Sequence, residues 1–153
     1  DAEVRIQGPR RQRRLPAAEL FVAPGTDVRR MHALERGEVL THIQLRAVPG
    51  RRSHFVKIAL RGSWDFALAS AAVAADLSNG HLQDCRIVLG ALAATPWRCF
   101  RAESELEGVE PTADRIQAAA DAALAGAEPE PDNAYRVALA RQAVVGALTE
   151  LVQ

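Results

Sequence analysis

The sequence has 153 residues, 48% of them hydrophobic, which is enough for one ordinary domain with a real core or for a domain with part of another. Its 19 basic and 19 acidic side chains cancel, which excludes a whole-chain field that would recruit nucleic acid or an anionic membrane. No apolar run approaches the roughly 20 residues that a membrane-spanning helix needs. The start, Asp1-Ala2-Glu3, has neither signal-peptide character nor an initiator methionine, so we expect a chain entered partway through a gene product.

The first third of the chain is predicted to hold three strands and a short helix. Val4 and Ile6 alternate with polar neighbours, which is strand patterning, and Gly8-Pro9 is a turn signal. The short helix is expected to begin at Pro16, because proline is favoured in the first turn of a helix. In chain order, the expected elements are a strand around residues 3–7, a strand over residues 12–15, a helix over residues 16–21, a loop over residues 22–36 and a strand over residues 39–45.

Four arginines, Arg10, Arg11, Arg13 and Arg14, form the one local excess of positive charge. They have two interpretations. Basic side chains on an edge strand block unwanted pairing, so a solvated hairpin edge is the simpler one. An arm that binds nucleic acid is the other, and it predicts affinity that collapses with salt.

The polar stretch over residues 50–53 is the candidate domain boundary, because the residue pattern changes after it. We expect a first domain over residues 1–48 and a second over residues 53–153. The second should begin with a long strand over residues 55–61.

Residues 66–77 are nearly all small and apolar, and two interpretations compete there. Alanine is the best helix former, so a helix fits by propensity. The segment ends at Ser78-Asn79-Gly80, a good hairpin turn, and residues 81–92 alternate as a partner strand. These features support a strand over residues 66–77, and the prediction of a strand there rests largely on the resemblance described below.

Three helices are predicted to finish the chain. The first should begin at Pro96-Trp97 and run to Leu106, Thr112 should cap the second, and Asp132 or Asn133 should cap the third. Strands followed by helices indicate an α+β fold, in which an antiparallel sheet is covered on one face by about three helices.

No residue pattern predicts a catalytic centre. The serines lack a nucleophile elbow, and the histidines are scattered without metal-ligand spacing. Glu103, Glu105 and Glu107 are expected to be a solvated helix face. Cys85 and Cys99 do not form a metal or redox motif. We expect free buried thiols in a reducing, cytoplasmic compartment, and a disulfide between them is the alternative.

Lys57 is the only lysine in the chain, since every other basic residue is arginine. The strand pattern places it on one face with Phe55 and away from Val56 and Ile58. It has two interpretations, a solvated strand lysine or a positive charge beside an electron-accepting ring, where it would stabilise the charge that develops on reduction. Asp65 is predicted to cap the turn that follows or to pair with Arg61.

Residues 55–74, FVKIALRGSWDFALASAAVA, closely resemble the FAD-binding (medium) subunit of molybdenum hydroxylases, the family of xanthine dehydrogenase and carbon monoxide dehydrogenase. Further similar stretches follow in order along the chain. They are residues 2–4, residues 37–43 (GEVLTHI), residues 86–90 (RIVLG), residues 95–98 (TPWR) and residues 133–140 (NAYRVALA).

The resemblance implies that residues 1–48 are the tail of the FAD-binding domain and that residues 53–153 are the flavoprotein C-terminal domain. It also implies that Leu40 and Lys57 contact the flavin, with Leu40 packing against the ring and Lys57 supplying charge near it. In this family FAD relays electrons from iron–sulfur clusters on a partner subunit to an acceptor, while a molybdopterin subunit oxidises the substrate. The implied partners are therefore the iron–sulfur and molybdopterin subunits. The balanced charge and the lack of a long apolar run predict no nucleic-acid or membrane partner.

The glycine-rich phosphate loops of the family have no counterpart in this sequence, nor does the aromatic residue expected near the flavin ring. Ala94 stands where the family usually has proline, and Cys99 where it has a small residue. The resemblance thus implies an incomplete FAD site, a missing N-terminal FAD-binding half and no catalysis by this chain alone. A stand-alone domain that binds a protein partner through its helical face is the alternative interpretation.

Overall fold

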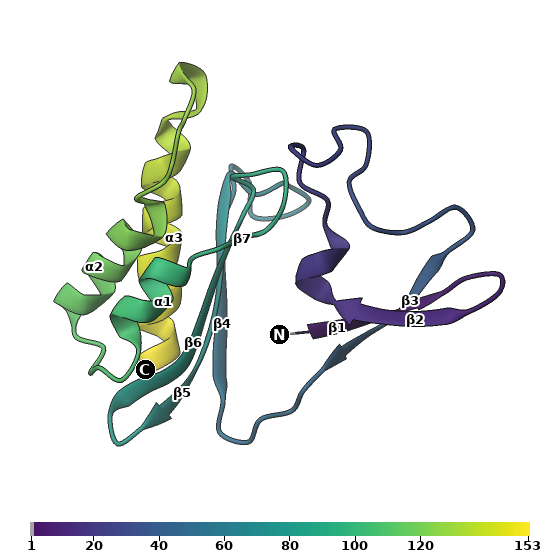
Figure 1. Cartoon of the computed structure of the whole chain (residues 1–153). Coiled ribbons are helices and arrows are strands. Elements are labelled where there is room, and N and C mark those ends of the chain that lie inside the picture. The colour runs from purple at the N-terminus through teal and green to yellow at the C-terminus, as the bar shows by residue number, and fades with distance from the viewer. Residues whose placement is uncertain (1) are drawn as a thin grey trace. The chain divides into compact units, whose positions relative to one another are not determined.

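The computed structural model describes residues 2–153, and the chain divides into two compact units, Asp1–Pro49 and Gly50–Gln153. Each unit has its own sheet (Figure 1). Each also has its own cluster of buried side chains. All the α-helices found within residues 2–153 belong to the second unit.

Unit 1 is built on a three-stranded antiparallel sheet. The strands are β1 (Ala2–Gln7), β2 (Gln12–Pro16) and β3 (Val39–Leu45), in the order β2-β1-β3. A single 3-10 turn, η1 (Ala17–Leu20), follows Pro16. The three predicted strands are confirmed, and the predicted short helix is this 3-10 turn.

The core of unit 1 is small, because only Val4, Ile6 and Leu15 are buried in it. A β-bulge shifts the register between β1 and β3, so that Arg5 pairs with His42 while Ile6 pairs with Leu40. The extra residue on β3 is Thr41, whose hydroxyl donates a hydrogen bond to the carbonyl of Arg5 at 3.1 Å. The bulge thus brings Leu40 onto the face that carries Ile6.

An ion pair between Arg13 and Glu38 links β2 to the start of β3. The Arg13 guanidinium donates to both carboxylate oxygens of Glu38, at 2.8 and 2.7 Å, and to the carbonyl of Ala33 at 2.8 Å. These hydrogen bonds from Arg13, with a further one from the backbone amide of Glu35, lower the pKa of Glu38 to about 2. Arg14 pairs with Glu3 on β1 at 3.5 Å, so two of the four clustered arginines form ion pairs within unit 1.

Unit 2 contains a four-stranded antiparallel sheet in the order β4-β5-β6-β7. Its strands are β4 (Arg52–Ile58), β5 (Ala69–Ser78), β6 (His81–Gly90) and β7 (Trp97–Arg98). The alanine-rich segment is therefore a strand from Ala69 onward, and its helical interpretation is wrong. The strand expected over residues 55–61 ends earlier, at Ile58, because the chain turns there into a loop.

The β5–β6 hairpin closes through the predicted turn. Asn79 and Gly80 both have positive φ, +51° and +79°, which is the pattern of a type I′ turn. The twist of this turn matches that of the flanking strands, so the sequence Asn-Gly fixes the register of the two longest strands.

The helices α1 (Phe100–Leu106), α2 (Ala113–Leu124) and α3 (Tyr135–Val152) lie on one side of this sheet (Figure 1). The α1 and α3 helices pack on the strands, and α2 packs on both of them. The predicted α+β fold, an antiparallel sheet covered by three helices, is confirmed within residues 2–153.

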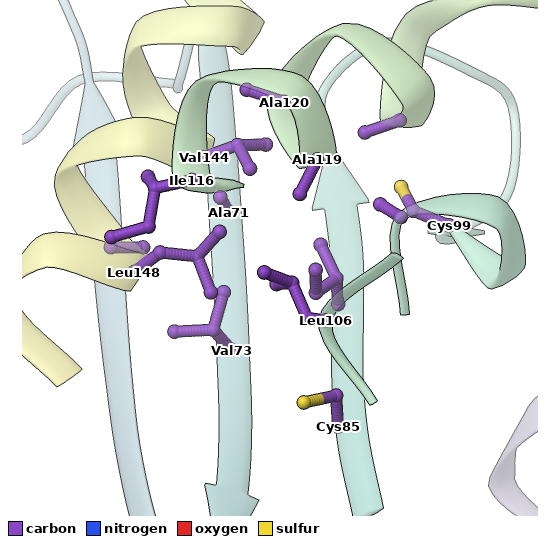
Figure 2. Packing of buried hydrophobic residues seen from close by; sticks show 14 of the residues in the cluster. Ala71, Val73, Cys85, Cys99, Leu106, Ile116, Ala119, Ala120, Val144 and Leu148 are labelled. Carbon is purple, nitrogen blue, oxygen red and sulfur yellow. The ribbon is translucent and has the colours of Figure 1, made fainter. Parts of the chain in front are cut away.

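Small side chains set the distance between the sheet and the helices. Ala71 on β5 and Ala119 and Ala120 on α2 are fully buried beside the larger Val144 and Leu148 of α3 (Figure 2). Because alanine adds little thickness, the backbones approach closely and the few large side chains fill the space between them.

Two predicted helix starts are wrong. Trp97 and Arg98 form the short strand β7 instead of a first helical turn, because they pair with Leu89 and Val88 of β6. At the start of α3, Asp132 and Asn133 belong to a separate 3-10 turn, η2 (Pro131–Asn133), and neither caps the helix. The cap predicted for α2 is confirmed, since the hydroxyl of Thr112 accepts a hydrogen bond from the Arg115 amide at 3.4 Å.

Candidate functional site

The side of the unit 2 sheet opposite the helices is exposed, and we call it the open face. On β4, Val56 and Ile58 pack toward the core, while Phe55 and Lys57 are exposed on the open face. This places Phe55 and Lys57 together, as the alternation predicts.

Small residues lie beside Lys57 on the neighbouring strands. Lys57 pairs with Ser70 on β5, and Ser70 pairs with Gly90 on β6, while Phe55 pairs with Ala72. Residues directly opposite each other in an antiparallel pair share a face of the sheet. The paired residues next to Lys57 therefore have small side chains.

Gly90 has no room for a side chain on this face. A Cβ atom added there would lie 2.6 Å from the hydroxyl oxygen of Ser70, well inside van der Waals contact. Gly90 thus leaves the space beside it to the Ser70 hydroxyl, and Ser70 itself is only 8% exposed.

The Lys57 ammonium is held by the loop that follows its strand. Its Nζ donates a hydrogen bond to the carbonyl of Asp65 at 3.1 Å. The Asp65 carboxylate in turn accepts a hydrogen bond from the backbone amide of Arg61 at 3.0 Å, and the Arg61 side chain lies 3.8 Å from the same carboxylate. Both interpretations of Asp65, a cap and a partner of Arg61, are confirmed.

The same loop presents large apolar side chains to solvent. Trp64 is 100% exposed and Phe66 is 94% exposed, and Leu60 is also exposed. Trp64 has a φ of +48°, a conformation that is unusual for a bulky residue. Three large exposed apolar side chains on the loop that contacts Lys57 are typical of a surface that contacts another molecule.

Leu40, the other predicted site residue, lies in unit 1 on β3. It is partly buried and packs against the cluster of Val4, Ile6 and Leu15. Its neighbours Val39 and Ile43 are exposed. Lys57 lies in unit 2, and the flavin contacts expected for Leu40 and Lys57 stay predictions.

The sequence pattern missed a buried carboxylate on α1. Glu103 is only 8% exposed, so its interpretation as part of a solvated face is wrong. Its Oε1 accepts hydrogen bonds from the Ile87 amide at 2.9 Å and from Arg98 Nε at 2.9 Å, and Arg98 Nη2 donates to Oε2 at 3.1 Å. This carboxylate fastens α1, β6 and β7 together.

Glu107 is also engaged with the sheet. Its carboxylate accepts from the backbone amides of Asp84 and Cys85, at 3.0 and 3.3 Å. Asp84 has a φ of +49°, and the register between β5 and β6 shifts next to it. Glu107 therefore supports an irregular point of β6. No local sequence signal points to either carboxylate, because both contacts depend on the packing of α1 against β6.

The two thiols are free and buried, as predicted, and the disulfide alternative is wrong (Figure 2). Burial raises the pKa of the Cys85 thiol to about 11 and that of the Cys99 thiol to about 12. Thiols with such pKa values are poor nucleophiles at neutral pH.

Across residues 2–153, no group of three or more histidine, cysteine, aspartate or glutamate side chains is placed to hold a metal ion.

A groove of about 540 Å³ lies where the ends of α2 and α3 meet the β6–β7 connection. Leu92, Trp97, Leu124 and Val137 give it apolar walls, and Arg136 lines it while donating a hydrogen bond to the Ala91 carbonyl at 3.1 Å.

Among residues 2–153 no helix combines the length and the apolar character needed to cross a membrane.

Residues 54–151 match the family model of the CO dehydrogenase flavoprotein C-terminal domain. This match covers well over half of the chain. The chain belongs to this family. The medium chain of carbon monoxide dehydrogenase from Hydrogenophaga pseudoflava is 34% identical over 97% of this chain and 51% of its own length. The FAD-binding subunit of aldehyde oxidoreductase from Escherichia coli is 29% identical over 90% of this chain and 40% of its own.

Solved structures of this flavoprotein family share the fold described above. Carbon monoxide dehydrogenase from Hydrogenophaga pseudoflava, in a form lacking the Mo-pyranopterin moiety, superposes with a TM-score of 0.86 at 34% identity. That match covers 98% of this chain and 52% of the solved chain. Quinoline 2-oxidoreductase from Pseudomonas putida gives a TM-score of 0.85 at 25% identity, covering 99% of this chain and 52% of the solved one. The chain spans about half the length of the relatives it matches.

Proposed function

We propose that this chain forms the C-terminal part of the FAD-binding subunit of a molybdenum hydroxylase. The observation that carries the proposal is the match over 97% of the chain to a carbon monoxide dehydrogenase medium chain, at 34% identity. Residues 53–153 act as the flavoprotein C-terminal domain, and residues 1–48 are the tail of the FAD-binding domain. The protein works in the cytoplasm, where a reducing environment keeps buried thiols free.

The residues of the open face suit a flavin. Lys57 offers an ammonium group that donates to the Asp65 carbonyl, Ser70 and Gly90 keep the side chains beside it small, and Phe55 adds an apolar ring. FAD supplies the redox chemistry in such a subunit, accepting and passing on electrons. Lys57 contributes a positive charge that favours the reduced ring, because the ring gains negative charge on reduction. Leu40 contributes apolar surface.

The partners of this subunit are an iron–sulfur subunit, which delivers electrons, and a molybdopterin subunit, which oxidises the substrate.

The FAD site of this chain alone is incomplete. No glycine-rich phosphate loop occurs in its sequence, and backbone amides of such loops provide most of the grip on a diphosphate. The phosphate ligands come from an N-terminal FAD-binding half, and this chain alone has no turnover.

A chimaera tests the proposal. The chain replaces the matching half of the Hydrogenophaga medium chain, and bound flavin is measured from its visible absorbance after gel filtration, with the isolated chain as the comparison. We expect about one FAD per chimaera and no stoichiometric FAD on the isolated chain. A folded chimaera without FAD would contradict the family role, and tight FAD binding by the isolated chain would contradict the incomplete site.

A further inference from the structure

The ammonium group of Lys57 is confined although the residue is exposed. A lysine side chain loses up to about 2 kcal/mol of rotamer entropy when it is fixed, so a surface lysine remains mobile unless a partner holds it. Here the partner is a single backbone carbonyl, that of Asp65, at 3.1 Å from Nζ. The position of Lys57 Nζ therefore depends on whatever fixes that carbonyl.

Two hydrogen bonds hold the loop that carries Asp65. The amide of Leu68 donates to the carbonyl of Ile58 at 2.8 Å, which closes the base of the loop. Further out, the Asp65 carboxylate accepts from the Arg61 amide at 3.0 Å and folds residues 61–65 into a turn. The side chain of Asp65 is 18% exposed, in keeping with an inward-facing cap.

The hydrogen bond that the Asp65 carboxylate accepts from the Arg61 amide folds the turn, and the ion pair with the Arg61 side chain contributes little to it. The Arg61 side chain is 75% exposed and its Nε lies 3.8 Å from the carboxylate. An exposed pair of this kind contributes little and is screened by salt. The hydrogen bond from the Arg61 amide, in contrast, restricts the backbone at Asp65, and the carbonyl of Asp65 accepts the hydrogen bond from Lys57.

We propose that Asp65 is a positioning residue for Lys57: its carboxylate folds the loop, and its own carbonyl then holds the ammonium group over the open face. This inference rests on the proposed function for its purpose, since it explains how an exposed lysine is kept at a defined place beside a ring. The contact between Lys57 and the Asp65 carbonyl lies within this chain, so it can be tested without a flavin.

The first test uses the isolated full chain and needs no flavin. Because Lys57 is the only lysine, labelling with [ε-¹³C]lysine gives a single side-chain NMR signal. In the unmodified chain we expect two distinct shifts for the ε-methylene protons and slow relaxation typical of a restrained group. Asp65→Ala should merge the two shifts and give the relaxation of a freely rotating lysine.

Two matched variants separate the hydrogen bond from the charge. Asp65→Asn keeps an oxygen that accepts from the Arg61 amide, so it should preserve the split signal. Arg61→Ala removes the ion pair and leaves the amide in place, so it should do the same. An unchanged Lys57 signal in Asp65→Ala would overturn the proposal, as would a mobile Lys57 in Asp65→Asn. The dispersed amide spectrum verifies that each variant is folded.

The second test uses the FAD-loaded chimaera and measures the flavin midpoint potential. Asp65→Ala should shift the potential in the same direction as Lys57→Met, and adding it to Lys57→Met should cause no further shift. An independent shift in the double variant would contradict action through Lys57. A chimaera that binds no FAD would defeat the proposed function, while the NMR result would still decide the positioning role of Asp65.

Discussion

Glu103 connects three elements of unit 2 through one carboxylate. It is buried, accepts the Ile87 amide and forms a two-pronged contact with Arg98. Removing the carboxylate would leave the buried Ile87 amide without its acceptor and would also remove the ion pair with Arg98, whose side chain is 32% exposed.

Glu103→Ala should therefore lower the free energy of unfolding of unit 2 by about 2 kcal/mol. Glu103→Gln keeps an acceptor for the Ile87 amide and should lose only about 1 kcal/mol. Glu105→Ala, at an exposed position on the same helix, is the control and should stay within about 0.5 kcal/mol of the unmodified chain. Urea unfolding followed by far-UV circular dichroism measures all three. Equal losses at Glu103 and Glu105 would contradict the structural role of Glu103.

Glu38 makes the stability of unit 1 depend on pH. Its hydrogen bonds with Arg13 and with the Glu35 amide lower its pKa from 4.5 to about 2. A group whose folded-state pKa is lowered stabilises the fold above its unfolded pKa, and this contribution disappears as the pH falls through the folded value.

We expect the unmodified chain to be more stable than Glu38→Gln at neutral pH. The difference should shrink as the pH falls from about 4.5 to about 2, since protonation removes the charge that Arg13 binds. Hydrogen exchange of the β1 and β2 amides reports on unit 1 specifically. A difference that stays constant over this pH range would show that the charge of Glu38 contributes nothing to folding.

Single residues were predictable where local pattern decides their place. Alternation along β4 placed Lys57 outward, and the short spacing between Arg61 and Asp65 predicted the capped turn. Glu103 was not predictable, because the carboxylate spacing on α1 suggests a solvated face. Its partner Arg98 lies on a two-residue strand that exists only through pairing with β6.

The hairpin of β5 and β6 is the central element of unit 2, and its surface depends on one close approach. Ser70 and Gly90 are paired residues, and the Ser70 hydroxyl occupies the space where a side chain of residue 90 would begin. Gly90→Ala should destabilise unit 2 by about 1–3 kcal/mol, the usual range for overpacking.

Adding Ser70→Ala to Gly90→Ala should recover most of this loss, because the clashing oxygen is then gone. Ser70→Ala alone is the control. Chemical unfolding of the four chains gives the coupling energy of the pair. Simple additivity would show that the two side chains do not compete for the same space.

Elements were predicted well where their signal is local. Asn79-Gly80 specifies its turn, and Thr112 its helix cap. The start of α1 was misplaced because Pro96-Trp97 has the form of a helix start. Tertiary pairing overrides it, since the amide of Cys99 donates to the carbonyl of Ile87 at 2.9 Å and keeps the chain extended on β6.

At the scale of the whole molecule, the order of the predicted strands and helices predicts an α+β protein, and the composition predicts little about its function. Its charges cancel and no catalytic or metal pattern stands out in the sequence. The ordered similarities along the chain predicted the family, and the match of residues 54–151 confirms it. The predicted contacts of Leu40 and Lys57 with a flavin rest on the family resemblance, because local sequence pattern encodes neither the ring nor its phosphate ligands.

The flavin midpoint potential of the FAD-loaded chimaera tests the central claim most directly. Lys57→Met removes the charge with little change in size, and Lys57→Arg keeps the charge. We predict that Lys57→Met lowers the potential by about 20 mV or more, since losing roughly 1 kcal/mol of charge stabilisation corresponds to about 20 mV for a two-electron couple. Lys57→Arg should remain close to the unmodified chimaera. An unchanged potential in Lys57→Met would contradict a flavin beside Lys57.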